Sequence, residues 1–119
     1  MMLFSTLGDS VFRKATLMKI VERHGFSLSR DCEKLCMHGD YARNIQLVFS
    51  KKDEIDGRAM VHKIYVGVNL YREKLVIGLI REYINIKNGV VVNTSNSISL
   101  SDYNESNIEA LVKKLLSVR

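Results

Sequence analysis

The sequence predicts a single α+β domain over residues 1–119, in which an antiparallel β-meander of about four to six strands is flanked by an N-terminal and a C-terminal helix packed on one face. Three observations support this. An amphipathic helical pattern stands at each end, the residues between alternate like half-buried strands, and the length fits one domain. Strands joined by short connections pair antiparallel, which favours a meander with both helices on the same side.

The N-terminal helix is expected to begin near Ser10, after a cap at Asp9. It is expected to stop at Gly25, since glycine readily adopts the left-handed conformation that ends helices. His24 lies in the last turn, where a cation is favoured. Apolar residues at helical spacing place the buried face at Val11, Phe12, Ala15, Met18 and Val21.

Strands are expected where apolar and polar residues alternate. Short strands are indicated around residues 26–28 and 35–37, and a clearer one over residues 44–50. Another is expected over residues 62–70. Its apolar face consists of Ile64, Val66, Val68 and Leu70. The six charges in residues 51–58 indicate an exposed hairpin loop between the two longer strands.

Residues 74–86 fit either a helix or a strand. A helix would have an acceptable polar face made of Lys74, Gly78, Arg81, Glu82 and Asn85. The remaining side chains are mainly β-branched or aromatic, which suits a pleated surface. Asn88 and Gly89 are typical of a hairpin turn and lead into residues 90–92. We therefore favour a strand.

The C-terminal helix follows Ile98 and Leu100, which extend or follow the last strand. Ser101 or Asp102 would open it, and Asp102 has the better capping-box spacing to Glu105. The apolar stripe that should cover the sheet is Ile108, Leu111, Val112 and Leu115. The cations that suit the end of the helix are Lys113, Lys114 and Arg119.

Composition narrows the class of protein. The net charge of +5 suits an anionic partner, either nucleic acid or an acidic protein surface. Two cysteines are too few for a disulfide framework, so we expect reduced thiols and a cytoplasmic location. No secretory leader is recognisable, and no run approaches the roughly 20 apolar residues of a membrane span. No membrane partner is therefore expected.

Reactive centres are not predicted. Possible metal ligands gather at Cys32, Cys36, His38 and Asp40. Their spacing fits no usual zinc site, so we expect no metal and no other cofactor. His24, His38 and His62 could serve acid–base chemistry, yet no nucleophile-elbow sequence accompanies them. Glycine-rich phosphate-binding loops are also absent. We expect no enzymatic activity and assign no catalytic residue.

Residues 63–70 resemble the first strand motif of RNA-recognition domains, which present an aromatic side chain on a sheet face for base stacking. Tyr65 would be the stacking residue and Lys63 a phosphate contact. Val68 is an extra residue in this alternation, and the second motif of those domains is missing. The segment supports an alternative function as a nucleic-acid-binding module that uses a basic and aromatic sheet face.

Three segments together have a wider resemblance: a first helix that ends in His24-Gly25-Phe26, then residues 44–49, then residues 64–70. This arrangement resembles the small immunity proteins encoded beside bacterial polymorphic toxins, including contact-dependent growth inhibition systems. The resemblance implies a cytoplasmic, non-enzymatic protein that binds one cognate toxin domain and occludes its active site. We expect a monomer or small homo-oligomer whose partner is a protein.

The charged tips are the expected contact points with such a partner, because charged protrusions steer encounter and set specificity. The expected partner-binding residues are Lys51, Lys52, Asp53, Glu54, Asp56 and Arg58, with Arg72 and Glu73 as a second tip. Two alternatives to a protein-binding inhibitor stay open. One is the nucleic-acid-binding module that uses Lys63 and Tyr65. The other is a small enzyme whose site brings His62 and a carboxylate together across the fold.

Overall fold

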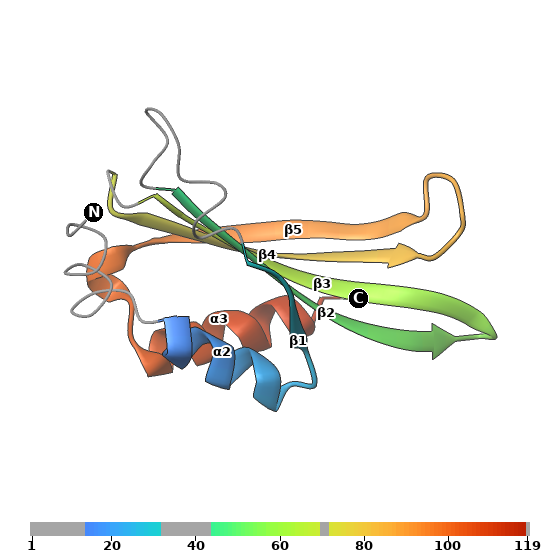
Figure 1. Ribbon diagram of the computed structural model, residues 1–119, viewed down its shortest axis with the longest axis horizontal. Coiled ribbons are helices and arrows are strands. Elements are labelled where there is room, and N and C mark those ends of the chain that lie inside the picture. The colour runs from blue at the N-terminus through green and yellow to red at the C-terminus, as the bar shows by residue number, and fades with distance from the viewer. Residues whose placement is uncertain (1–13, 32–43, 70–71, 119) are drawn as a thin grey trace.

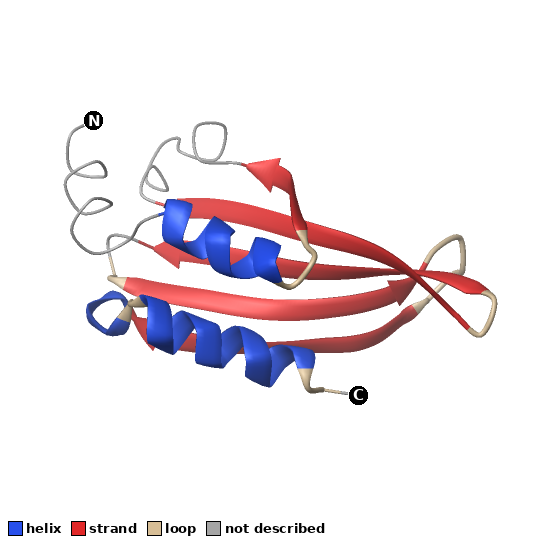
Figure 2. Cartoon of the chain, turned by 90° about the horizontal axis from the view of Figure 1, so that it is seen from below, coloured by secondary structure: helices blue, strands red, loops and turns tan. Residues whose placement is uncertain are grey.

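A computed structural model describes residues 14–31, 44–69 and 72–118. These residues form a five-stranded antiparallel sheet, ordered β1-β2-β3-β4-β5, with two α-helices on one face (Figures 1 and 2). The elements are α2 (Lys14–Arg23), β1 (Ser27–Asp31), β2 (Asn44–Ile55), β3 (Arg58–Asn69), β4 (Lys74–Tyr83), β5 (Val90–Ser99), the 3-10 helix η2 (Leu100–Asp102) and α3 (Glu105–Leu116). The α+β meander is confirmed.

The N-terminal helix ends as expected, and its buried face overlaps the expected one only in part, at Val21 and the half-buried Met18. Gly25 has a φ of 90°, the left-handed conformation that stops α2. The buried side chains are Leu17, Ile20 and Val21, whereas Ala15 is exposed and Met18 is half-buried. The larger branched side chains at i, i+3 and i+4 bury more apolar surface than a face that includes alanine. The expected start at Asp9 and Ser10, with Val11 and Phe12, lies outside the described residues.

The charged connection expected over residues 51–58 is mostly strand. β2 continues to Ile55 and β3 begins at Arg58, and these two residues pair across the hairpin. Only Asp56 and Gly57 form the turn, with φ of 53° and 76°. Two left-handed residues make the tight turn whose twist matches that of paired strands, and Asp-Gly is a preferred pair for it. The expected strand at residues 35–37 lies outside the described residues.

The ambiguous segment is β4, which confirms the strand interpretation. Leu75, Ile77 and Leu79 alternate into the core. The following turn is wider than a two-residue hairpin, because β4 ends at Tyr83 and β5 begins at Val90. Asn85 and Asn88 take left-handed φ values of 62° and 58° in this connection, a conformation that asparagine tolerates well. β5 then includes Ile98, as expected.

The last helix has the expected stripe and a different cap. Ile108, Val112 and Leu115 are buried, and Leu111 is half-buried against them. The N-cap is Asn104, whose side chain accepts a hydrogen bond of 2.8 Å from the Asn107 amide. The expected caps, Ser101 and Asp102, instead belong to η2. The capping-box spacing misled the prediction because the short 3-10 turn delays the helix start.

We expect Asn104→Ala to lower the free energy of unfolding by about 1 kcal/mol, because an amide at the start of α3 loses its acceptor. Urea titration of both proteins measures the difference. Ser106→Ala, at an exposed position in the first turn, is the control and should change the free energy by less than about 0.5 kcal/mol. Equal effects of the two substitutions would contradict the cap.

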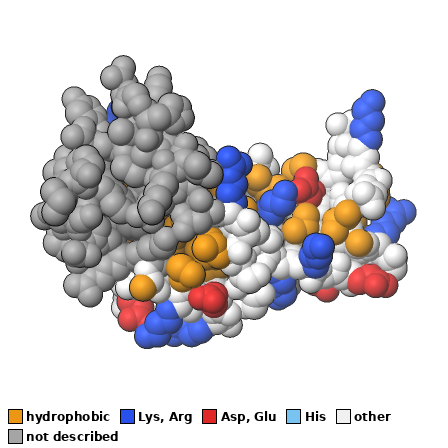
Figure 3. Space-filling view, in the orientation of Figure 1, with side chains coloured by type: hydrophobic (Ala, Val, Ile, Leu, Met, Phe, Trp, Pro, Cys, Tyr) orange, Lys and Arg blue, Asp and Glu red, His pale blue; other side chains and the backbone are white. Residues whose placement is uncertain are grey.

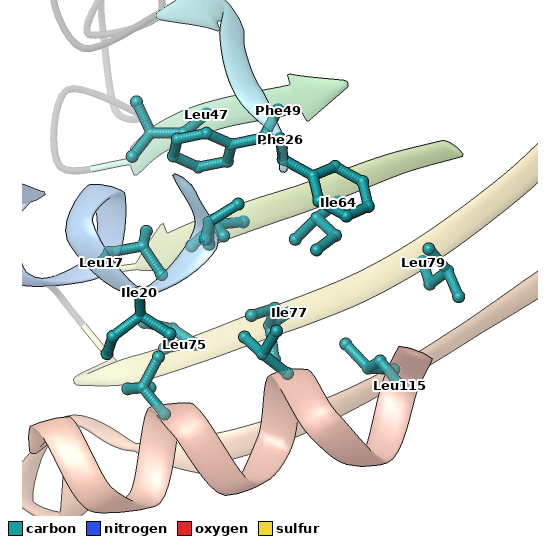
Figure 4. Packing of buried hydrophobic residues seen from close by; sticks show 14 of the residues in the cluster. Leu17, Ile20, Phe26, Leu47, Phe49, Ile64, Leu75, Ile77, Leu79 and Leu115 are labelled. Atoms are coloured by element: carbon teal, nitrogen blue, oxygen red, sulfur yellow. The ribbon is translucent and has the colours of Figure 1, made fainter. Parts of the chain in front are cut away.

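The core lies between the two helices and one face of the sheet (Figure 4). Phe49, Ile64 and Leu79 form one cross-strand row of buried side chains, and Leu47, Val66 and Ile77 form the next. Gly78 and Tyr65 pair on the opposite, open face of the sheet. The helices cover only part of their own face, since β2–β5 continue past the C-terminal end of α3 (Figures 1 and 2). This uncovered continuation, residues 51–62 and 81–92, is named the distal arm.

Candidate functional site

The distal arm arises because its strands keep pairing where the core ends. Lys51, His62, Arg81 and Val92 form the first cross-strand row beyond the core on the helix side of the sheet. The next row on that side contains Asp53, Met60 and Tyr83, followed by Ile55 paired with Arg58. Alternate residues of each strand point to the same face of the sheet. Polar residues that are far apart in the sequence therefore lie together on the helix side, beside the end of α3.

Arg81 joins this row to the C-terminal end of α3. Its Nη2 donates a 3.1 Å hydrogen bond to the carbonyl of Leu116, and its Nη1 donates to the carbonyl of Val118. The last carbonyls of a helix have no partner within the helix and carry its negative dipole end. The half-buried guanidinium therefore satisfies the carbonyl of Leu116, the last residue of α3, and binds that of Val118 just beyond it, which attaches the end of α3 to the sheet.

His62 lies between Arg81, which is bonded to it, and the carboxylate of Asp53. The Nε of Arg81 donates to Nδ1 of His62 over 3.2 Å, which leaves the imidazole proton on Nε2. Nε2 lies 3.7 Å from Oδ2 of Asp53. Burial and the charge of Arg81 lower the pKa of His62 below 6.5, and the opposing effect of Asp53 is smaller. The structure thus places His62 near a carboxylate, as the enzyme alternative requires. His62 is neutral and accepts a hydrogen bond from Arg81.

We expect the free energy of unfolding to fall as the pH is lowered below 6.5. His62 has a lower pKa in the folded protein, so the unfolded chain binds its proton first. The stabilisation is complete above 6.5 and is lost as the pH falls through the folded pKa. Protonation of Nδ1 would also remove the acceptor of the hydrogen bond from Arg81. Lys51 would repel the protonated ring, and Asp53 would attract it.

Urea midpoints measured on both sides of pH 6.5, and above about pH 5 where ordinary carboxylates stay ionised, provide the test. The control is His62→Gln, which offers an acceptor to Arg81 and does not titrate. We expect a clearly flatter pH dependence for this variant. An unchanged slope would show that other groups cause the dependence.

A hollow of about 610 Å³ lies next to this cluster, at the end of α3. Its apolar lining includes Ile55, Met60, Val91 and Val92, and its polar lining includes His62 and Arg81. Val91 is 54% exposed and Ile55 is 36% exposed, although both are large apolar side chains. The hollow is therefore an apolar surface in contact with solvent and bordered by charged groups.

The expected partner-binding residues of the first tip all lie on the distal arm and are exposed. Lys51, Asp53 and Arg58 belong to the helix side, Lys52 and Glu54 to the open face, and Asp56 to the turn. Three cations and three carboxylates give this tip no net charge. Figure 3 accordingly shows basic, acidic and apolar side chains interspersed over the arm.

Two of these cations also contact aromatic rings. The Nζ of Lys51 lies 5.8 Å from the ring centre of Phe26, and the guanidinium carbon of Arg58 lies 5.9 Å from that of Tyr83. Such contacts hold long side chains in defined positions. The second tip, Arg72 and Glu73, lies at the other end of the sheet, between β3 and β4. The structure therefore does not bring the two tips into one surface.

The nucleic-acid alternative falls on the open face. Lys63 and Tyr65 lie there beside a shallow hollow of about 510 Å³ that Arg30 and Lys52 also line. The ring of Tyr65 covers Gly78, where an added Cβ would lie 2.2 Å from its Cζ. The Nζ of Lys63 is 2.8 Å from Oε1 of Glu82. Both expected residues thus have cross-strand partners within the sheet.

Some features were missed from the sequence. The apolar hollow and the bond from Arg81 to α3 depend on strand lengths and on where the last helix returns. The long hairpin of β2 and β3 did have a signal in the sequence. Asp56 and Gly57 are typical of a two-residue turn, which would have placed the charged residues on either side of it in strands. Cys32, Cys36, His38 and Asp40 lie outside the described residues. Within the described ranges, no three His, Cys, Asp or Glu side chains gather as metal ligands.

Comparisons of the chain with protein-family models, with curated proteins and with solved structures return no match. Function is therefore inferred from the arrangement of these residues. In the part of the chain that the structure describes, neither helix has the length and apolar character needed to cross a membrane.

Proposed function

We propose that this chain is a non-enzymatic, protein-binding inhibitor whose distal arm docks on one cognate protein domain. The observation that carries the proposal is the uncovered apolar hollow at the end of α3, bordered by a charged tip without net charge. The hollow would receive an apolar side chain of the partner. The surrounding charges would select the partner and orient it.

Charge balance favours a protein over a polyanion at this surface. Nucleic acids bind through clustered cations that displace counterions from phosphates. The tip instead alternates Lys51 and Lys52 with Asp53 and Glu54, and it ends in Asp56 and Arg58. An apolar centre with a polar border of both signs is the usual anatomy of a specific protein interface.

The arm is also suited to block a partner's active site. β2 and β3 pair continuously from Asn44 and Asn69 to Ile55 and Arg58, and a tight turn closes the hairpin. A surface already ordered before binding loses little conformational entropy when it docks. The resemblance to immunity proteins extends the proposal: the partner is a toxin domain in the cytoplasm, and the arm occludes its active site.

The test uses the domain encoded beside the gene for this chain, expressed alone and together with the chain. Growth arrest by that domain should be relieved by the wild-type chain. Ile55→Asp and Arg58→Glu should weaken binding, measured by calorimetry, by about tenfold or more each. The first places a charge in the hollow, and the second reverses the charge of the strand partner of Ile55.

Arg72→Glu is the matched control, because Arg72 is an exposed arginine beside the turn at the other end of the sheet. It should bind and protect like the wild type. Failure of the wild-type chain to bind or protect would overturn the inhibitor proposal. Equal losses at Arg58 and Arg72 would exclude the distal arm as the docking surface.

A second candidate function is nucleic-acid binding on the open face. Its support is the hollow there, lined by Arg30, Lys52, Lys63 and Tyr65 with no carboxylate in the lining. Single-stranded RNA should then bind with an affinity that falls steeply with salt, and Lys52→Ala should reduce that salt dependence. Absence of salt-dependent binding would exclude this function without affecting the proposal for the distal arm.

A further inference from the structure

The outer edge of β5 differs from every other part of the sheet. β5 is the last strand in the order, so one of its two edges has no strand partner among the described residues. Residues 88–101, which contain β5, carry no charged side chain, while each of the other four strands carries at least two charged residues. Exposed strand edges are normally protected by charges, proline or shortness.

The opposite edge of the sheet shows that protection. β1 has only five residues, carries Arg30 and Asp31, and has a bulge between Leu28 and Arg30. β5 has ten residues, and its single register irregularity lies near its start, opposite Arg81 and Glu82. A regular, uncharged edge thus remains over residues 92–99.

We propose that β5 pairs antiparallel with β5 of a second copy of this chain, joining two five-stranded sheets into one. A strand that pairs with itself around a two-fold axis is automatically in a compatible register. The two-fold axis would be perpendicular to the sheet, which places the helices of both copies on the same side. Every second residue of the paired segment exchanges two main-chain hydrogen bonds with its partner.

Charge favours a second copy over a different partner. Two copies each carry a net charge of +5 and repel one another over most surfaces. The β5 edge itself carries no charged side chain, so the paired strands add nothing to this repulsion. The β5 edge also has no charged side chain that could select an oppositely charged protein. The side chains on the open face here are small and polar: Asn93, Ser95, Ser97 and Ser99.

The position of α3 also fits this pairing. α3 packs against both β4 and β5 and lies along the β5 border of the sheet (Figure 2). Strands lie about 4.8 Å apart, so two copies of α3 centred between these strands would have axes about 10 Å apart. Packed helices have axes separated by about 8–10 Å. With α3 in that position, the pairing brings its two copies to packing distance.

Leu111 would then gain a partner. Glu109 faces α2, where it lies 3.4 Å from His24, so Leu111, roughly 200° further around the helix, faces the β5 border. Arg81 bonds to Leu116 and pairs with Val92. Leu111 lies five helical residues before Leu116, and Thr94 lies two strand residues after Val92. Each of these separations spans roughly 7 Å, so Leu111 lies level with Thr94, near the centre of the paired segment. The two copies of this half-buried side chain would meet there.

The experiment measures the molar mass of the full chain by sedimentation equilibrium over a range of concentrations. We expect a concentration-dependent species of twice 13.6 kDa. Ser95 lies near the centre of residues 92–99, so Ser95→Lys and Ser95→Glu each bring like charges close together across the two-fold axis and should weaken the dimer by about tenfold or more. An equimolar mixture of the two variants should restore it, since opposite charges then meet.

The matched control is Ser27→Lys, which adds the same charge to an exposed serine on the other edge of the sheet. This variant should remain dimeric. A wild-type chain that is monomeric at every concentration would overturn the proposal. So would a dimer that Ser95→Lys leaves intact, or one that Ser27→Lys disrupts equally. Circular dichroism and urea midpoints establish that each variant is folded.

Discussion

Replacing Arg81 with methionine is expected to lower the free energy of unfolding by about 3 kcal/mol. The guanidinium makes two hydrogen bonds to carbonyls at the end of α3 and a third to His62. Hydrogen bonds from a charged donor contribute about 1.5–3 kcal/mol each, and partial access of water to the helix end reduces the sum. Methionine retains much of the apolar stem, so the loss reports mainly on the polar contacts.

Urea unfolding of the two proteins at neutral pH measures this difference. Arg23→Met is the control, because Arg23 also joins a helix to its neighbour, with its Nη2 3.3 Å from Oε1 of Glu105. Its side chain is 49% exposed, so the ion pair should contribute at most about 1 kcal/mol. A loss at Arg81 no larger than that at Arg23 would show that the bonds to α3 do not hold the helix end to the sheet.

Replacing Gly78 with alanine is expected to lower the free energy of unfolding by about 2 kcal/mol. The added Cβ would lie 2.2 Å from Cζ of Tyr65, a separation that no real contact allows. The ring must therefore leave its place over Gly78, and it loses its cross-strand packing on the open face. The measurement is again urea unfolding.

Gly67→Ala provides a matched control, since a Cβ at Gly67 meets nothing within 4 Å. Its free energy of unfolding should be unchanged or higher by up to about 1 kcal/mol, because alanine restricts the unfolded chain. In the background Tyr65→Thr, the cost of Gly78→Ala should largely disappear. A cost that persists without the ring would mean that the backbone, and not Tyr65, requires glycine at this position.

The local periodicities of the sequence predicted several of the helices and strands. The alternation of Ile64, Val66 and Val68 and the helical stripe of Ile108, Val112 and Leu115 both point into the core. These patterns follow from the two-residue repeat of a strand and the 3.6-residue repeat of a helix, which neighbouring residues specify by themselves. The stop at Gly25 is local in the same sense.

The candidate site was less accessible to the same reasoning. Its charged residues were recognised, but they were assigned to a loop and not to paired strands. Asp56 and Gly57 carried the local information needed for that correction. No comparable signal places Arg72 and Glu73 far from Asp56, because their separation depends on the full length of β3.

The sequence alone thus determined an α+β meander with its helices at the two ends of the chain, since short-range periodicity and turn chemistry specify these features. Tertiary structure decided how far the sheet extends beyond α3, that Arg81 meets the carbonyls of Leu116 and Val118, and that His62 lies beside Asp53. It also left the uncharged edge of β5 at the border of the sheet. Each of these features depends on strand pairing and helix packing between residues that are distant in the chain, and no local sequence repeat specifies such contacts.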